Sequence, residues 1–166
     1  MQFSKGVEYA LHSLLQMLNA PAGKSVGIRE LASFQGISET YLSKIFTKLR
    51  KAGVVKAAPG VNGGYELARA PENITFWDVI EAVEGSSDMF QCIEIRQNTA
   101  TLDKNNLPDS YTKCPCLIKT VMLDAEEQMR KHLRGKNIGW LRDEVQKKIP
   151  FEQQKAAEEW FGIKNR

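Results

Sequence analysis

Three cysteines are the residues of this chain best suited to chemistry. Cys114 and Cys116 flank a single proline, and Cys92 lies 22 positions before Cys114. An odd number of cysteines does not fit a framework of structural disulfides in a cytosolic chain. Thiolates are good nucleophiles and good ligands for soft metals. The pattern therefore indicates reactive thiols or metal ligands.

Glu8 and His12 form a second candidate pair, near the start of the chain. Residues 3–18 are predicted to form a helix because apolar side chains recur there at helical spacing. This apolar stripe consists of Val7, Leu11, Leu14, Leu15 and Leu18. Residues four apart are neighbours on one helix face, so Glu8 and His12 lie together beside the stripe. On spacing alone, a local Glu–His pair at the helix surface is the simplest interpretation.

The residues from Ile28 to Leu67 contain the elements that would give the chain a target. A helix is predicted over residues 27–35, with a mostly inward set of Ile28, Leu31, Ala32 and Phe34. Gly36 allows a left-handed turn, and Ser38 is a good N-cap for the next helix. That helix ends at Gly53 and is predicted to bury Leu42, Ile45, Phe46 and Leu49.

The exposed face of this second helix is polar and basic. It consists of Thr40, Tyr41, Ser43, Lys44, Thr47, Lys48 and Lys51. Short hydroxyl side chains and Tyr41 near its start suit contacts to base edges in a major groove, and the lysines further along suit phosphates. A merely solvated polar face is the alternative.

A β-hairpin is predicted directly after this helix. Val54 to Ala58 forms one strand, Tyr65 to Ala68 forms the other, and the connection PGVNGG contains the turn-forming pair Asn62-Gly63. The glycines of this tip allow a close approach to a sugar–phosphate backbone. Two helices joined by a tight turn and followed by a hairpin are the layout of a winged helix-turn-helix, a DNA-reading unit.

The rest of the chain is predicted to be mainly helical. A helix over residues 75–84 presents one face of Phe76, Val79, Ile80 and Val83. Residues 85–113 lack periodicity and are predicted to form a long loop, of the kind that is often functional. A long helix then begins at Leu117. Its apolar edge suits pairing with a second copy, or else packing on the same chain, and consists of Leu117, Val121, Ala125, Met129 and Leu133.

The predicted fold is therefore mainly α with a small β wing. Four segments are expected: a winged helix-turn-helix DNA-binding domain over 1–84, a cysteine-bearing sensor loop over 85–116, dimerisation helices over 117–149, and a C-terminal helix or tail over 150–166. The last segment either packs Trp160 and Phe161 on the domain or stays loose.

Charge and composition narrow the function. Residues 1–70 hold nine Lys/Arg against four Asp/Glu, whereas residues 71–166 hold fourteen against sixteen, so the basic first half suits a polyanion. The chain has no apolar run of 18 residues and no signal-peptide pattern, so a cytoplasmic protein is expected. No nucleophile–base–acid set is visible and PGVNGG lacks the Lys-Ser/Thr of a phosphate-binding loop, so an enzyme is not expected.

Taken in order, these motifs resemble the Rrf-two type of winged-helix transcription regulators. The resemblance is carried by VEYALHSLL, IRELA, GISETYLSKIFTKLRKAGVV, PGVNGGYELAR and ITFWDVIEAVEG, followed by late cysteines that open a long helix. The family includes the iron–sulfur regulator IscR, the nitric-oxide sensor NsrR, the cysteine-metabolism repressor CymR and the redox sensor RsrR. The resemblance implies a homodimer, usually a repressor, whose two heads bind a near-palindromic operator.

Within the family, the segments GVEYALH and FQCIEIRQ most resemble the RsrR branch. That similarity implies a 2Fe–2S cluster shared between two subunits, with two cysteines from one and a helical Glu–His pair from the other. The matching residues here are Cys114, Cys116, Glu8 and His12, with Cys92 as a reserve ligand or redox-active thiol. The cysteines are not evenly spaced as in IscR-like members, and Lys119 follows the last cysteine where those members have a histidine.

The resemblance also assigns DNA contacts. The readers of bases or backbone would be Ser38, Thr40 and Tyr41, and the phosphate contacts Lys44, Lys48 and Lys51. IscR-like wings carry an arginine for the minor groove. Pro59 occupies that place here, with Lys56 nearby, so the wing glycines Gly60, Gly63 and Gly64 are expected to allow backbone approach only.

Two regulators without a cluster remain possible from the sequence. In one, the three cysteines form a disulfide or an adduct under oxidants and so act as a thiol switch. In the other, the cysteines are incidental and the protein senses a metabolite or a protein partner, as CymR does. A module that docks onto protein rather than DNA would not need the basic helix face.

Overall fold

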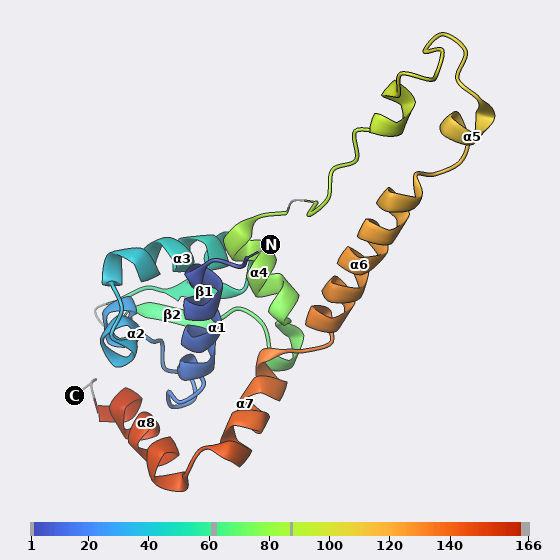
Figure 1. Ribbon diagram of the computed structural model, residues 1–166. Coiled ribbons are helices and arrows are strands. Elements are labelled where there is room, and N and C mark those ends of the chain that lie inside the picture. The colour runs from blue at the N-terminus through green and yellow to red at the C-terminus, as the bar shows by residue number, and fades with distance from the viewer. Residues whose placement is uncertain (1, 61–62, 87, 164–166) are drawn as a thin grey trace. The chain divides into compact units, whose positions relative to one another are not determined.

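The computed structural model describes residues 2–60, 63–86 and 88–163 (Figure 1). The chain forms two compact units. The first, called the head below, combines residues 2–86 with the residues from Leu133 onward, and the second, called the sensor unit, ends at His132. Each unit is described by itself.

Four helices build the centre of the head: α1 (Lys5–Met17), α2 (Ile28–Gln35), α3 (Glu39–Lys51) and α4 (Phe76–Glu84). The predicted apolar face of α3 is fully confirmed, because Leu42, Ile45, Phe46 and Leu49 are all buried. The predicted face of α4 needs one correction. Trp77 is buried with Val79, Ile80 and Val83, whereas Phe76 is only half-buried, because it sits at the first position of the helix.

The helix boundaries follow the predicted turn and cap chemistry. Gly36 ends α2 in the left-handed region with φ of 66°, and the Ser38 side chain accepts a hydrogen bond from the Tyr41 backbone N–H at 3.3 Å. Thr75 and Asp78 form a reciprocal capping box at the start of α4. These local contacts fix where α3 begins and therefore which residues its exposed face presents.

The wing is an antiparallel pair of strands, β1 (Val55–Ala58) and β2 (Gly64–Leu67). The turn predicted at Asn62-Gly63 includes Asn62, which lies outside the described residues. A feature not expected from the sequence is a bridge from Val26, whose N–H and carbonyl each pair with the backbone of Tyr65 at 2.9 Å. The wing is therefore fastened to the segment between α1 and α2.

The chain after the sensor unit returns to the head. Ile138 N–H donates to the Ile74 carbonyl at 3.0 Å and Phe76 N–H to the Lys136 carbonyl at 2.8 Å, which tie η1 (Pro71–Asn73) and α4 to α7 (Ile138–Lys148). α8 (Phe151–Ile163) packs as well, since the ring of Phe161 is buried with its centroid 5.0 Å from that of Phe34. The head thus includes α7, and whether α7 also serves dimerisation stays a prediction.

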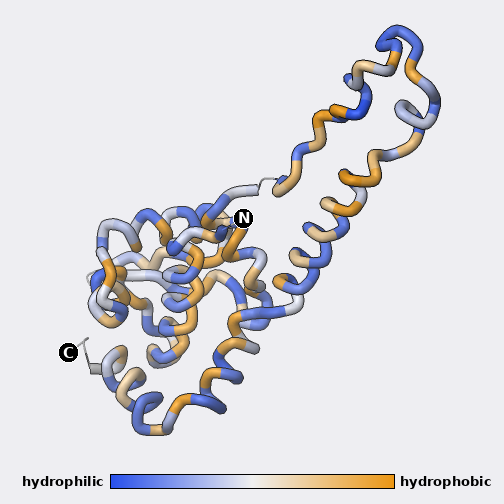
Figure 2. The backbone as a smooth tube through the Cα atoms, viewed as in Figure 1, coloured by the Kyte–Doolittle hydropathy of each residue, from blue (hydrophilic) through white to orange (hydrophobic). Residues whose placement is uncertain are grey.

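The sensor unit contains η2 (Ile95–Asn98), α5 (Asp109–Thr112) and most of α6 (Leu117–Arg134). The loop predicted over 85–113 therefore carries two short helical turns, which side-chain contacts hold in place. Among the described residues of this unit only Glu126 is buried. The apolar residues at the start of α6, visible in Figure 2, stay exposed; Leu117 is 80% exposed and Val121 67%.

No helix in the described part of the chain combines the length and apolarity needed to cross a membrane.

Candidate DNA interface and cysteine site

The polar face of α3 is open to solvent. Thr40, Tyr41 and Ser43 are exposed near the start of the helix, and Ser38 is exposed at its N-cap. Tyr41 also has a structural contact, because its ring meets that of Tyr9 edge-on at a centroid distance of 5.8 Å. The start of α3 is therefore both accessible and supported from behind by α1.

The lysines of α3 are not equivalent. All three side chains are exposed, but the Lys48 ammonium donates to the carbonyl of Val83, near the end of α4, at 2.6 Å. Lys48 would have to leave this carbonyl to contact a phosphate. Arg50, which the sequence analysis did not single out, is exposed and adds a further cation in the last turn. The helical spacing of the buried residues already places Arg50 outside the apolar face, so the sequence alone could have identified this cation.

The predicted wing residues have partners within the chain. Lys56 forms an ion pair with Glu66 on the neighbouring strand at 3.2 Å. A methyl group at Gly63 would lie 2.7 Å from the carbonyl oxygen of Ala58, and one at Gly64 would lie 2.5 Å from that of Val26. Gly60 has φ of 121°, which favours glycine. Packing and turn geometry thus require these glycines, whether or not they also approach DNA.

Cys116 occupies the N-cap position of α6. Its carbonyl accepts from the Thr120 N–H at 2.9 Å, the first hydrogen bond of the helix. The backbone N–H of Lys119 lowers the pKa of the Cys116 thiol, helped by the N–H of Ile118 and by Arg96 and opposed by desolvation and Glu94. A thiol at a helix N-terminus is stabilised as the thiolate, which is the form that binds metals and attacks electrophiles.

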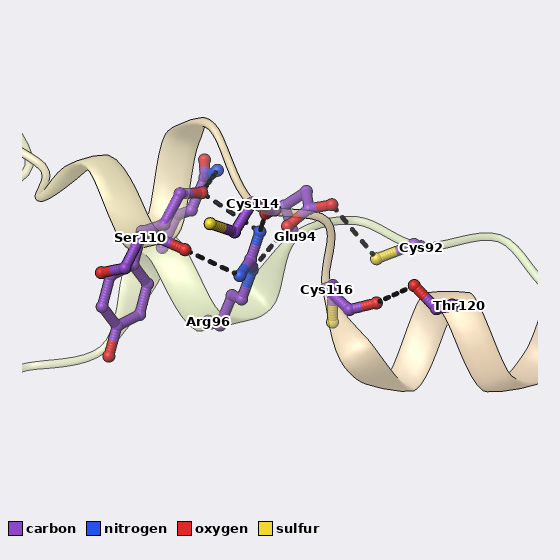
Figure 3. A network of polar contacts seen from close by, with 9 residues as sticks. Cys92, Glu94, Arg96, Ser110, Cys114, Cys116 and Thr120 are labelled. Atoms are coloured by element: carbon purple, nitrogen blue, oxygen red, sulfur yellow. Dashed lines mark hydrogen bonds and ion pairs between the residues drawn. The ribbon is translucent and has the colours of Figure 1, made fainter.

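A polar network surrounds the cysteines (Figure 3). The Cys92 thiol donates to one carboxylate oxygen of Glu94 at 3.7 Å, and Arg96 donates to the other at 2.9 Å. Arg96 also donates to the carbonyl of Cys114 at 2.6 Å. The network therefore links Cys92 to the Cys114–Cys116 turn.

Glu8 and His12 lie one turn apart on the exposed surface of α1, as predicted. Both border a pocket of about 500 Å³ in the head. The other residues at this pocket include the apolar side chains Phe3, Leu11, Phe76 and Leu141. Across the described residues of a single chain, no group of three or more His, Cys, Asp or Glu is arranged to hold a metal ion. The structure contains two separate pairs, Glu8–His12 in the head and Cys114–Cys116 in the sensor unit.

Comparison with known proteins identifies the family. The sequence profile of the Rrf2 family, described as "Iron-dependent Transcriptional regulator", matches residues 3–144. This chain belongs to the Rrf2 family. The HTH-type transcriptional regulator IscR of Aliivibrio salmonicida is 33% identical over 139 residues, 83% of this chain and 74% of that protein. NsrR of Halalkalibacterium halodurans is 31% identical over 103 residues, 62% of this chain and 70% of that protein.

A solved structure confirms the fold class. CymR, the global cysteine regulator of B. subtilis, matches with a TM-score of 0.65 at 20% identity, covering 86% of this chain and 97% of that one. Because the relatives of this Rrf2 protein are transcriptional regulators, it is a DNA-binding regulator and not an enzyme. The closer resemblance to the RsrR branch stays a prediction.

Proposed function

We propose that this Rrf2 protein is a homodimeric repressor that binds a near-palindromic operator and senses redox or iron–sulfur status through a 2Fe–2S cluster. The observation that carries the DNA-binding part is the exposed face of α3, which joins hydroxyls and Tyr41 at its start to cations in its last turn. Side chains in this order suit base edges first and phosphates further along.

The dimer part of the proposal rests on the apolar edge of α6. Leu117, Ile118 and Val121 are each at least 67% exposed in the single chain, and Met122 and Leu123 are also exposed. Contiguous exposed apolar side chains on a long helix mark an interface. Pairing of two α6 helices would bury this edge and carry two heads at a fixed separation, as a two-fold symmetric operator requires.

The cluster part rests on the chemistry of the donor set. Cys114 and Cys116 lie two apart across Pro115, and the lowered pKa of Cys116 favours a thiolate ligand. Glu8 and His12, one helical turn apart and both accessible, could bind the other iron. The four residues fit a 2Fe–2S cluster that bridges two copies, because each copy would supply one pair of ligands. Cys92, whose thiol donates to Glu94, stays in reserve as a third ligand.

When bound, such a cluster would supply a one-electron redox change, and ligands other than thiolate raise its potential. The chain's own residues would convert that change into DNA binding. Glu8 and His12 lie on α1, whose Tyr9 contacts Tyr41 at the start of α3. A displacement of α1, caused by a change in the cluster that it shares with the partner's cysteine turn, would therefore be passed to α3, the proposed DNA-reading helix.

DNA binding is tested by electrophoretic mobility shift with the full chain at low salt, using DNA selected from a random pool. Specific retention with a two-fold symmetric footprint is expected. Thr40→Ala should weaken selection at particular bases, whereas Lys44→Ala should weaken binding to all sequences alike. No retention of any duplex would contradict the function.

The cluster is tested by anaerobic purification, with iron and sulfide counted and an absorption spectrum recorded. Two irons and two sulfides per chain are expected. The proposed dimer would hold two clusters, each between the Glu8–His12 pair of one copy and the Cys114–Cys116 pair of the other. Glu8→Ala and His12→Ala should each change the spectrum, and Gln16→Ala, one turn further along α1, is the matched control. A colourless, iron-free protein that binds DNA normally would end the cluster proposal. Unchanged spectra in both variants would leave cysteines as the sole ligands.

A thiol switch is the second candidate, because Cys116 is accessible and its pKa is lowered. In that case an iron-free protein would lose or gain DNA affinity on treatment with peroxide, and the change would reverse with dithiothreitol. An iron-free protein that is indifferent to oxidants would point instead to a metabolite or protein partner.

A further inference from the structure

Arg96 joins two parts of the sensor unit that are far apart in sequence. Its guanidinium donates to the carbonyls of Ser110 at 3.3 Å, Tyr111 at 3.2 Å and Cys114 at 2.6 Å, while Nε donates to Glu94 at 2.9 Å. Figure 3 shows the side chain lying between the segment of Cys92 and the segment of Cys114. One side chain therefore bridges the long gap between the cysteines.

The contacts of Arg96 replace those that α5 cannot make for itself. A helix of four residues has carbonyls at its end without partners in the helix, and a turn this short is unstable alone. Arg96 supplies donors to the carbonyls of Ser110 and Tyr111, and the side-chain amide of the adjacent Gln97 adds another to Tyr111 at 2.8 Å. The η2 turn thus acts as the C-terminal cap of α5, and Cys114 follows directly.

Glu94 holds the guanidinium from the other side. It is the non-glycine residue with positive φ among the described residues, at 52°, a conformation that persists only where the surroundings impose it. In this conformation its carboxylate reaches both Arg96 and the Cys92 thiol. Arg96 and Glu94 form an ion pair with a separation of 2.9 Å. The left-handed backbone of Glu94 and its ion pair with Arg96 both indicate that the fold holds the Glu94 side chain in this position.

We propose that Arg96 is the positioning residue of the cysteine site: through its forked contacts to Glu94 and to the carbonyls of Ser110, Tyr111 and Cys114, it folds the Cys-Pro-Cys turn against the Cys92 segment before any metal binds. The role needs a planar fork, since an ammonium is a point donor and cannot span these acceptors at once. This role of Arg96 rests on the proposed function only for the identity of the ligand, a 2Fe–2S cluster, that the turn would bind.

The test compares Arg96→Lys and Arg96→Gln with the wild-type chain by hydrogen–deuterium exchange of the iron-free protein. The reporters are the backbone amides of Tyr111 and Lys113, which donate to the carbonyls of Pro108 and Asp109. Both variants should speed their exchange about tenfold, because the turn opens locally. Arg142→Lys, at another multiply paired arginine in α7 of the head, is the matched control and should leave these amides unchanged. Tryptophan fluorescence checks that the head stays folded.

Unchanged exchange in both Arg96 variants would overturn the proposal. Wild-type exchange in Arg96→Lys alone would also overturn it, because charge without the fork would then suffice. If the wild-type protein carries iron, both variants should hold at least twofold less iron per chain and show an altered visible spectrum. If the wild-type protein carries none, the cluster function fails, while the exchange measurement still decides the role of Arg96.

Discussion

The head and the sensor unit are held together by different forces. The head buries a set of apolar side chains from α1, α2, α3, α4, α7 and α8, and most of them are shielded almost completely from solvent. In the described part of the sensor unit no apolar side chain is buried, and the contacts are polar: Arg96 with four acceptors, and Glu126 with Arg130 and the Met89 N–H. Burial of apolar surface is the main stabilising term in folding.

This difference shows that the head has an apolar core of its own, whereas the described residues of the sensor unit form none. Hydrogen bonds at a surface contribute little net stability, whereas exposed Leu117 and Val121 offer apolar surface to a partner. In the proposed dimer a second copy would cover this surface, and a ligand bound at the cysteines would act on the unit that buries no apolar side chain among its described residues.

The most disruptive change should be Val121→Glu, which places a charge on the exposed edge of α6. The proposed dimer should dissociate, and operator affinity should fall about 100-fold because the two heads no longer bind together. Sedimentation velocity and mobility shift measure the two effects. Lys131→Glu also places a carboxylate at an exposed position of α6, but on a different face from the apolar edge, and should change neither. A dimeric Val121→Glu protein would show that the edge is not the interface.

Phe46→Ala should destabilise the head by about 3–5 kcal/mol, because Phe46 is fully buried beside the ring of Tyr65. Urea unfolding followed by tryptophan fluorescence is a suitable measurement, since all three tryptophans, Trp77, Trp140 and Trp160, belong to the head. Leu117→Ala should leave this transition in place. An equal shift for both variants would mean that the two units unfold as one.

Lys44→Ala should reduce the slope of log affinity against log salt by about one unit, as expected for the loss of one phosphate contact. Lys48→Ala should change the slope by less, because its ammonium is held by the Val83 carbonyl. Binding isotherms at several salt concentrations, read by fluorescence anisotropy, measure both slopes. A larger effect at Lys48 would show that this intramolecular contact breaks on DNA.

The smallest effect concerns pH. Because the α6 N-terminus lowers the pKa of Cys116, its thiolate should persist to lower pH than in the unfolded chain. Alkylation of Cys116 by iodoacetamide in the iron-free protein, followed by mass spectrometry, should therefore reach half its maximal rate at lower pH than after denaturation in urea. If the folded and the denatured protein gave the same pH profile, the N-terminus of α6 would not lower the pKa of Cys116.

The sequence predicted the head better than the sensor unit for a physical reason. Leu42, Ile45, Phe46 and Leu49 repeat with the period of a helix, and Ser38 and Gly36 carry local cap and turn chemistry, so each could be recognised from a few neighbouring residues. The pairing of Glu8 with His12 on one surface followed equally from their spacing.

The missed features are long-range contacts between side chains and backbone. Arg96 reaches residues 14 to 18 positions away, Lys48 reaches Val83, and Val26 pairs with Tyr65. Such contacts depend on the folded path of the chain and leave no period in the sequence. For the proposed ligands, the sequence pattern indicated thiols or metal ligands at the cysteines, and only the family resemblance joined Cys114 and Cys116 with Glu8 and His12 in one site.

The close approach of Gly64 to the Val26 carbonyl has a consequence for mutational tolerance. No residue with a Cβ atom fits there without moving backbone, so a library selected only for soluble, folded protein should reject every substitution at this position. The same selection should accept most substitutions at Thr40, which is exposed on α3, and only a selection for repression should restrict it. Comparing the two selections would separate the residues that build the reading head from those that read.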